Sequence, residues 1–191
     1  MPVIQSEIDA NSPEFAQNKE AMLAAIASFR DVEQLVLNKA NEAKAKFDKR
    51  GQLLPRERMN LLLDPGAPFL ELSSLAGYKL HDDKDGSMAG GGIIAGIGYV
   101  EGVRALVIAN NSAIKGGTIS PSGLRKSLRL QQIARENKLP VITLAESGGA
   151  NLAYAGEIFV EGARAFANQA RMSALGLPQI TVVHGSSTAG G

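Results

Sequence analysis

The stretch that decides the fold is GGGIIAGIGYVEGVRALVIANNS, residues 90–112. Two apolar runs, at 93–100 and 104–109, flank Glu101-Gly102, and a short polar-glycine pair in this position favours a tight hairpin turn. We therefore predict two antiparallel strands joined at Glu101-Gly102. The glycines at 96, 98 and 102 approach the spacing of a dinucleotide-binding motif. The last glycine comes one residue late, however, and the motif lies inside the hairpin, which excludes that function.

The segments after the hairpin alternate between helical and strand patterns. We predict a helix at 124–137, a buried strand at 139–144, a long helix at 156–175 and a second buried strand at 179–183. Strands that alternate with helices imply right-handed crossovers and parallel pairing. The predicted fold class is therefore α/β.

The amino-terminal segment has a helical pattern. Ser12-Pro13 supplies an N-cap and a first-turn proline, and apolar residues then recur at steps of three and four on one helix face. These residues are Met22, Ile26, Phe29, Val32 and Val36. We interpret the basic stretch 39–58 as a solvated helix face, although it could also hold one nucleotide phosphate. We expect residues 1–48 to be a helical extension and residues 49–191 to be the domain.

The composition excludes several classes of function. The formal net charge is +1, from 20 basic and 19 acidic side chains, which is too balanced for the broad basic face that binds nucleic acid. The chain has no cysteine and 2 histidines, so we expect no disulfide, no cysteine nucleophile and no metal. Because no signal pattern and no membrane-spanning run is present, we expect a cytoplasmic protein without membrane contact.

Two polar segments have glycines or acids that suggest ligands. The stretch 81–86 is rich in aspartate, but it lacks the ligand spacing of an EF-hand, so we interpret it as a solvated loop. Lys115-Gly116-Gly117-Thr118 lacks the spacing of a phosphate-binding loop, because its lysine precedes the glycines. We interpret it as a tight turn or, alternatively, as a contact for the phosphate of an acyl carrier.

The stretch AESGGANLA, residues 145–153, follows a predicted buried strand. It approaches the nucleophile elbow of hydrolases, but His184 is the only histidine downstream of Ser147, and no acid is placed to orient it. The favoured interpretation is that the main-chain N–H groups of the turn stabilise a developing oxyanion. Thr188-Ala189-Gly190-Gly191 repeats the arrangement one strand later, so the two turns can converge on one oxygen.

Four segments carry a family resemblance: GQLLPRERMNLLLDPGAPFLEL, KGGTISPSGLRKSLRLQQIA, PVITLAESGGANL and GLPQITVVHGSSTAGG. Together they resemble the amino-terminal half of the carboxyltransferase β subunit of biotin-dependent acyl-CoA carboxylases. The resemblance covers about residues 47–191, and the sequences of these segments are closer to the methylcrotonoyl-CoA branch than to the propionyl-CoA branch.

The resemblance implies a crotonase-like (ClpP/crotonase) fold of stacked ββα units with an amino-terminal helical extension. It implies an enzyme that transfers CO₂ from carboxybiotin, held on a partner carrier protein, to the α or γ carbon of an acyl-CoA through an enolate. The biotin ureido nitrogen is the base, so no catalytic triad is needed. The implied partners are acyl-CoA, a biotin carboxylase or biotin carboxyl carrier subunit, and further copies of the β subunit.

The resemblance also assigns roles to residues. The thioester oxygen is expected at Gly148, Gly149, Ala150, Gly190 and Gly191. The pantetheine and phosphates of CoA are expected near Lys115, Gly116, Gly117, Thr118, Arg125, Lys126 and Arg129. Arg125 and Arg129 are four residues apart and share a helix face, for which surface solvation is the alternative.

The resemblance ends inside a glycine turn, and the biotin-facing half of the family is absent. We therefore expect a fragment of a longer gene product that does not turn over alone. Two alternatives stay open. One is a biotin-independent crotonase relative, such as a hydratase or decarboxylase, with Glu146 or Glu157 as its carboxylate. The other is a non-catalytic CoA-binding module.

Overall fold

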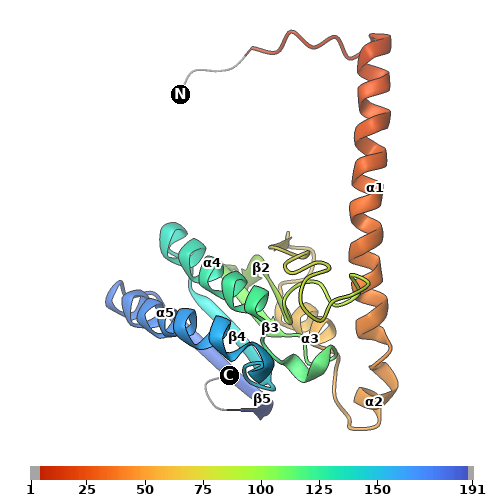
Figure 1. Cartoon of the computed structure of the whole chain (residues 1–191). Helices are drawn as coiled ribbons and strands as arrows, with labels where there is room; N and C mark the ends of the chain where they lie inside the picture. Colours follow the sequence, from red (N-terminus) through yellow and green to blue (C-terminus); the bar gives the residue numbers. More distant parts are fainter. Residues whose placement is uncertain (1–4, 189–191) are drawn as a thin grey trace.

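The structure is a computed structural model that describes residues 5–188 (Figure 1). Its centre is a five-stranded sheet in the order β1-β2-β3-β4-β5. The short β1 (Leu70–Glu71) pairs antiparallel with β2 (Ile93–Val100), and β2 pairs antiparallel with β3 (Val103–Asn110). From β3 onward, the pairing is parallel.

The predicted hairpin is confirmed. β2 and β3 pair along their whole length, from Ile93 opposite Asn110 to Val100 opposite Val103. Glu101 and Gly102 both have positive φ, at 50° and 74°, as a two-residue type I′ turn requires. The carboxylate of Asp64 accepts both of their main-chain N–H groups, at 2.7 and 2.8 Å, and so fixes the turn.

The predicted helical connections between parallel strands are also confirmed. α4 (Pro121–Asn137) connects β3 to β4 (Val141–Ser147), and α5 (Ala155–Ala174) connects β4 to β5 (Gln179–Ser187). Some predicted boundaries were wrong. α4 begins at Pro121 because the Ser120 side chain caps it by accepting the N–H of Gly123, at 3.1 Å. β4 and β5 continue past their predicted ends, to Ser147 and Ser187.

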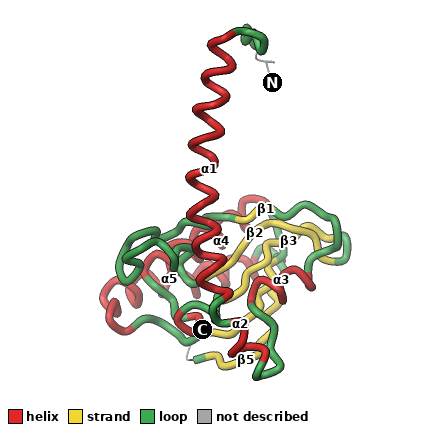
Figure 2. The backbone as a smooth tube through the Cα atoms, turned by 90° about the vertical axis from the view of Figure 1, so that its right-hand side faces the viewer, coloured by secondary structure: helices red, strands yellow, loops and turns green. Residues whose placement is uncertain are grey.

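Each face of the sheet packs against different helices (Figures 1 and 2). On one face, Leu130 and Ala134 of α4 and Met172 of α5 join a buried cluster with Leu106 and Val141. On the other face, the buried Met59 of α3 (Pro55–Leu62) packs against a second cluster, whose strand members are Ile94, Ala105, Val107, Ala109 and Leu144. Strands β2 to β4 therefore lie between two packed layers, whereas β5, at the edge of the sheet, has no buried residue.

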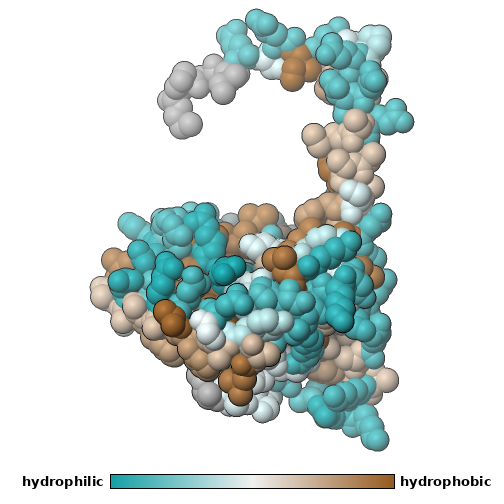
Figure 3. Space-filling model, viewed as in Figure 1, coloured by the Kyte–Doolittle hydropathy of each residue, from teal (hydrophilic) through white to brown (hydrophobic). Residues whose placement is uncertain are grey.

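The amino-terminal helix α1 (Pro13–Asn41) extends away from the sheet (Figures 1 and 2). Its predicted cap is confirmed, since Ser12 Oγ accepts the N–H of Phe15 at 3.1 Å. The apolar face predicted from sequence is only partly covered by the described chain, because Val32 and Val36 are partly buried and α1 has no fully buried residue. Met22 and Phe29 are 61% and 45% exposed, and Figure 3 shows apolar side chains along this helix.

The basic stretch 39–58 is not a single solvated face. α2 (Lys44–Asp48) buries Phe47, and Lys44 pairs with Asp48 and Glu57. Arg58 is mostly buried and contacts the end of β5. The division of the chain at residue 48 stays a prediction. Within residues 5–188, no helix combines the length and the apolar character needed to cross a membrane.

Candidate active site

The side chain of Ser147, at the end of β4, forms its hydrogen bonds within the protein, beside the turn that follows the strand. Ser147 is 1% exposed. Its Oγ accepts the main-chain N–H of Gly149 at 3.0 Å and donates to the carbonyl oxygen of Gly117 at 3.4 Å. His184 lies on the opposite face of the sheet, against Arg58. The hydroxyl therefore stabilises the turn, and the geometry does not support a serine nucleophile.

Gly148 and Gly149 allow other parts of the backbone to approach. A Cβ on Gly148 would lie 2.8 Å from Thr118 Oγ1 and 3.1 Å from the carbonyl oxygen of Gly116. Gly149 has a φ of +80°, and a Cβ on it would lie 3.4 Å from the carbonyl oxygen of Thr188. We call residues 147–150 the glycine turn. It lies between the Lys115–Thr118 segment and the end of β5.

Ile119, which directly follows the Lys115–Thr118 segment, is linked by main-chain hydrogen bonds to the glycine turn and to the residue after it. The N–H of Ile119 donates to the carbonyl oxygen of Gly149 at 2.8 Å, and Asn151 donates to the carbonyl oxygen of Ile119 at 2.9 Å. The segment forms the short 3-10 helix η1 (Lys115–Gly117), with a φ of 62° at Gly116 and 72° at Gly117. Two motifs that are about thirty residues apart in sequence are therefore neighbours at one edge of the sheet.

The second predicted glycine segment starts beside the first. The N–H of Thr188 donates to the carbonyl oxygen of Ser147 at 3.1 Å, which places the start of this segment next to the glycine turn. Gly190 and Gly191 lie outside the described residues. Their predicted convergence on the same oxygen stays a prediction.

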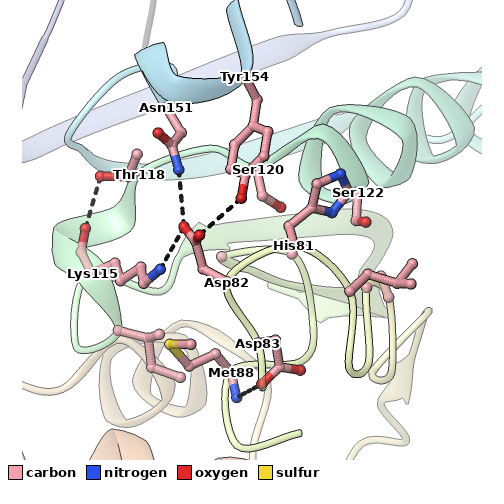
Figure 4. Close-up of a pocket in the computed structure, with 16 residues that line it drawn as sticks. His81, Asp82, Asp83, Met88, Lys115, Thr118, Ser120, Ser122, Asn151 and Tyr154 are labelled. Atoms are coloured by element: carbon pink, nitrogen blue, oxygen red, sulfur yellow. Dashed lines mark hydrogen bonds and ion pairs between the residues drawn. The ribbon is translucent and has the colours of Figure 1, made fainter. Parts of the chain in front are cut away.

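A hollow opens next to the glycine turn, between the loop after β1 and η1 (Figure 4). The side chain of Asp82 forms hydrogen bonds with residues on the other side of this hollow. Its carboxylate accepts hydrogen bonds from Lys115 Nζ at 2.7 Å, Tyr154 Oη at 2.8 Å and Asn151 Nδ2 at 3.3 Å. We call these four residues the Asp82 cluster. Lys115 and, to a smaller degree, Tyr154 lower the pKa of Asp82, and Asp82 raises the pKa of Tyr154.

The loop at 81–86 is solvated at Asp82, Lys84 and Asp85, as predicted, but Asp83 is buried and orders it. Asp83 is 5% exposed, and its carboxylate accepts the N–H groups of Lys79 and Met88, both at 3.0 Å. The signal for this was present in the sequence, because aspartates beside glycines often accept nearby main-chain N–H groups and order a loop. Sequence reasoning missed Asp82, Asn151 and Tyr154 as neighbours of the predicted site.

The predicted phosphate-binding side chains do not form one group. The Lys115 ammonium is bound to Asp82. Arg125 and Arg129 are exposed on one face of α4, and Arg125 lies 3.9 Å from Glu161. Lys126 is 4% exposed and donates to the carbonyl oxygens of Ile93 and Gly90, at 2.6 and 3.2 Å. Burial lowers the pKa of Lys126 to about 8, and this placement does not fit a contact with a phosphate at the surface.

The carboxylates considered for a hydratase or decarboxylase lie in two different places. Glu146 points to the α3 side of the sheet, where it accepts a hydrogen bond from Ser112 at 2.7 Å. Glu157 is half exposed and lies 3.5 Å from His81. Among residues 5–188, no three histidine, aspartate or glutamate side chains are grouped to hold a metal ion.

The described geometry defines an α/β domain with a backbone-lined turn at the carboxyl ends of parallel strands. A family profile described as the carboxyl transferase domain matches residues 46–191. The chain belongs to this family, as the resemblance predicted.

Curated relatives include methylcrotonoyl-CoA carboxylase β chains. The one from Drosophila melanogaster is 46% identical over 99% of this chain and 33% of its own length. The β1 subunit of the 3-methylcrotonyl-coenzyme A carboxylase of Mycobacterium tuberculosis is 43% identical over 95% of this chain and 34% of its own length. A propionyl-CoA carboxylase β chain from Cereibacter sphaeroides is 32% identical over 74% of this chain and 28% of its own length. The chain thus spans about a third of these relatives.

Solved structures agree with the predicted fold. The β subunit of Pseudomonas aeruginosa geranyl-CoA carboxylase has a TM-score of 0.90 and 76% identity, over 100% of this chain and 36% of that chain. A transcarboxylase 12S structure has a TM-score of 0.73 and 21% identity, over 84% of this chain and 32% of that chain. The crotonase-like α/β fold is therefore confirmed. Because the Drosophila relative is named mitochondrial, the expected cytoplasmic location stays a prediction.

Proposed function

We propose that this chain is the acyl-CoA-binding part of the carboxyltransferase β subunit of a biotin-dependent acyl-CoA carboxylase. The observation that supports this most is the glycine turn, where main-chain amides lie without side chains between the Lys115–Thr118 segment and Thr188. The N–H of Gly149 already binds Ser147. In this proposal, the N–H groups of Gly148 and Ala150, with those of the segment 190–191, therefore receive the thioester oxygen.

These N–H donors would act when the acyl-CoA loses a proton from a carbon atom that is conjugated, once deprotonated, with the thioester carbonyl. Negative charge then develops on the thioester oxygen, and N–H groups fixed in advance stabilise it. The loss of one such donor costs about 3–4 kcal/mol of transition-state stabilisation. Carboxybiotin, when bound by the complete enzyme, supplies the CO₂ and the base. The absence of a Cβ at Gly148 lets Thr118 and Gly116 pack directly against the turn, which fixes the main-chain N–H groups in place. We assign no residue of 5–188 to the biotin ring.

The substrate class that we propose is a 3-methyl-branched 2-enoyl-CoA. Relatives and structures named for methylcrotonoyl-CoA and geranyl-CoA are 46% and 76% identical to this chain, whereas one named for propionyl-CoA is 32% identical. The methylcrotonoyl and geranyl groups both carry a methyl-branched double bond conjugated to the thioester. Deprotonation at the γ carbon therefore delocalises charge onto the thioester oxygen, and we propose carboxylation at that carbon.

The complete protein would assemble with further copies of itself and with a biotin carboxylase and a biotin carrier subunit. A transcarboxylase 12S, whose structure is described as a hexamer, shares the fold. We also propose that the piece of 191 residues does not turn over alone, because the family's biotin-facing half is not part of it.

A substrate panel tests this proposal. The complete carboxylase that contains this chain is assayed for ATP-dependent carboxylation of 3-methylcrotonoyl-CoA, geranyl-CoA and propionyl-CoA. We expect kcat/KM for at least one branched enoyl-CoA to exceed that for propionyl-CoA by about 10-fold or more. A preference for propionyl-CoA would contradict the substrate class. Biotin-independent hydration or decarboxylation, or binding without any reaction, would contradict the carboxyltransferase role.

A further inference from the structure

The pairing of β4 with β5 is interrupted next to the glycine turn. The strands are in register up to Ala145 opposite Val183, and pairing resumes with Ser147 opposite Ser187. Three residues of β5, 184–186, therefore lie opposite a single residue of β4, Glu146. Bulges of this kind bend a strand and redirect its side chains, and they are frequent beside active sites.

Glu146 is fixed inside this bulge. Its side chain is 13% exposed, and Oε2 accepts a hydrogen bond from Ser112 Oγ at 2.7 Å. The position of Gly185 leaves room for it, since a Cβ there would lie 2.7 Å from Glu146 Cγ. A side chain at 185 would therefore displace the carboxylate.

Arg58 and His184 complete the group on the α3 side of the sheet. Arg58 Nη1 lies 3.8 Å from Glu146 Oε2 and 3.2 Å from His184 Nε2. Because a guanidinium only donates, Nε2 accepts, and the proton of the neutral imidazole is then on Nδ1, which lies 4.0 Å from Glu146 Oε2. We call Arg58, Ser112, Glu146 and His184 the rear cluster.

We propose that Arg58, Glu146 and His184 are positioning residues, which set the bulge and thereby the distance between the glycine turn and the segment that begins at Thr188. This inference rests on the proposed function, because it concerns the two segments assigned to the thioester oxygen. Glu146 directly precedes Ser147, and His184 precedes Thr188 by four residues. Arg58 extends from α3 to both, so one side chain joins the two strand ends.

The charges around His184 give this arrangement a pH dependence. Burial and the nearby Arg58 lower the pKa of His184, and Glu146 opposes them. Arg58 of α3 and Glu146 of β4 are the charged groups that face the ring. Protonation would place a second cation beside Arg58 and remove the acceptor for its N–H. We therefore expect kcat to fall on the acid side. Because Glu146→Gln removes the charge that raises the pKa, this acid limb moves to lower pH in that variant.

The test compares Glu146→Gln and Arg58→Lys with Glu42→Gln in the complete carboxylase. Glu42 is a matched control, because it is also an ion-paired glutamate but lies at the end of α1 and is 65% exposed. We expect kcat for the preferred enoyl-CoA to fall by about 10- to 100-fold in the first two variants, since small misplacements cost this much. KM is expected to change by less than about 3-fold.

Amide hydrogen exchange at residues 148–150 separates this inference from the proposed function, because it does not depend on turnover. We expect faster exchange there in Glu146→Gln and Arg58→Lys, with no change in Glu42→Gln. If the wild type carboxylates no acyl-CoA but the exchange rates change as expected, the proposed function fails and the positioning role stands. Unchanged exchange and unchanged kcat per folded molecule, or an acid limb that does not move, would overturn the positioning role.

Discussion

Two groups of side chains surround the glycine turn, and they differ in burial. The rear cluster lies on the α3 side of the sheet, where the side chains of Glu146, Arg58 and His184 are 13%, 18% and 17% exposed. The Asp82 cluster is nearer the solvent, and its central pair, Asp82 and Lys115, is 45% and 44% exposed. Removing one partner from a buried polar group leaves the other unsatisfied, whereas water replaces an exposed partner. The rear cluster should therefore control the fold of the turn, and the Asp82 cluster should control the hollow beside it.

The largest effect is expected at the glycine turn, which both clusters contact. In the complete carboxylase, Gly148→Ala should lower kcat by about 100-fold or more, because its Cβ would clash with Thr118 and Gly116 and so displace the N–H groups of the turn. Steady-state kinetics with the preferred enoyl-CoA measure this. Gly162→Ala is the matched control, since Gly162 lies in α5 with nothing within 4 Å of an added Cβ. Equal kinetics in both variants would contradict the account.

The second effect compares the stabilities contributed by the two clusters. Arg58→Ala should lower the free energy of unfolding by about 1–3 kcal/mol, because it leaves buried acceptors of the rear cluster unpaired. Asp82→Ala, whose partners meet water, should change it much less. Urea denaturation of the two variants provides the comparison. A larger loss of stability in Asp82→Ala would reverse the proposed order of the clusters.

A third prediction concerns pH. The pKa of His184 is below its ordinary value of 6.5 in the folded protein, so the unfolded chain binds more protons at this site between the two values. The contribution of His184 to stability is therefore fully present above pH 6.5 and declines as the pH falls through this range. His184→Gln should flatten the pH dependence of the melting temperature there. A melting temperature of the wild type that rises on acidification would contradict the sign.

The smallest effect is expected in the Asp82 cluster. Asp82→Asn keeps an acceptor for Tyr154 and removes the charge that holds Lys115, so acyl-CoA KM should change by about 2- to 5-fold with kcat nearly constant. The direction of the change is informative. A lower KM means that the released Lys115 contacts a CoA phosphate, and a higher KM means that Asp82 shapes the hollow. A large loss of kcat would show that the two clusters do not differ as proposed.

Much of this arrangement could be predicted from sequence, because it follows from local patterns. The hairpin at Glu101-Gly102, the Ser12 cap and the parallel strands each have short-range signals, and all are confirmed. The internal bonding of Ser147 and the link between Ile119 and Gly149 depend on how distant segments pack. Sequence spacing contains little of that information, which also explains why the burial of Lys126 and of Asp83 was not predicted.

The rear cluster shows the same limit more clearly. Arg58 and His184 are separated by more than a hundred residues, and they meet only because α3 packs on the end of β5. The sequence suggested a solvated role for the basic stretch that contains Arg58 and showed no acid placed to orient His184. The connection of His184 to Arg58 and Glu146 required the three-dimensional fold.

The most direct test of the central claim observes the thioester carbonyl itself. An enoyl-CoA labelled with ¹³C at the thioester carbon is bound to the complete protein, and its carbonyl stretch is recorded by isotope-edited infrared spectroscopy. The account predicts a shift to lower frequency on binding, because N–H donors polarise the carbonyl. The shift should be lost in Gly148→Ala and retained in Gly162→Ala. No shift in the wild type, or an equal shift in Gly148→Ala, would show that the glycine turn does not hold the thioester oxygen.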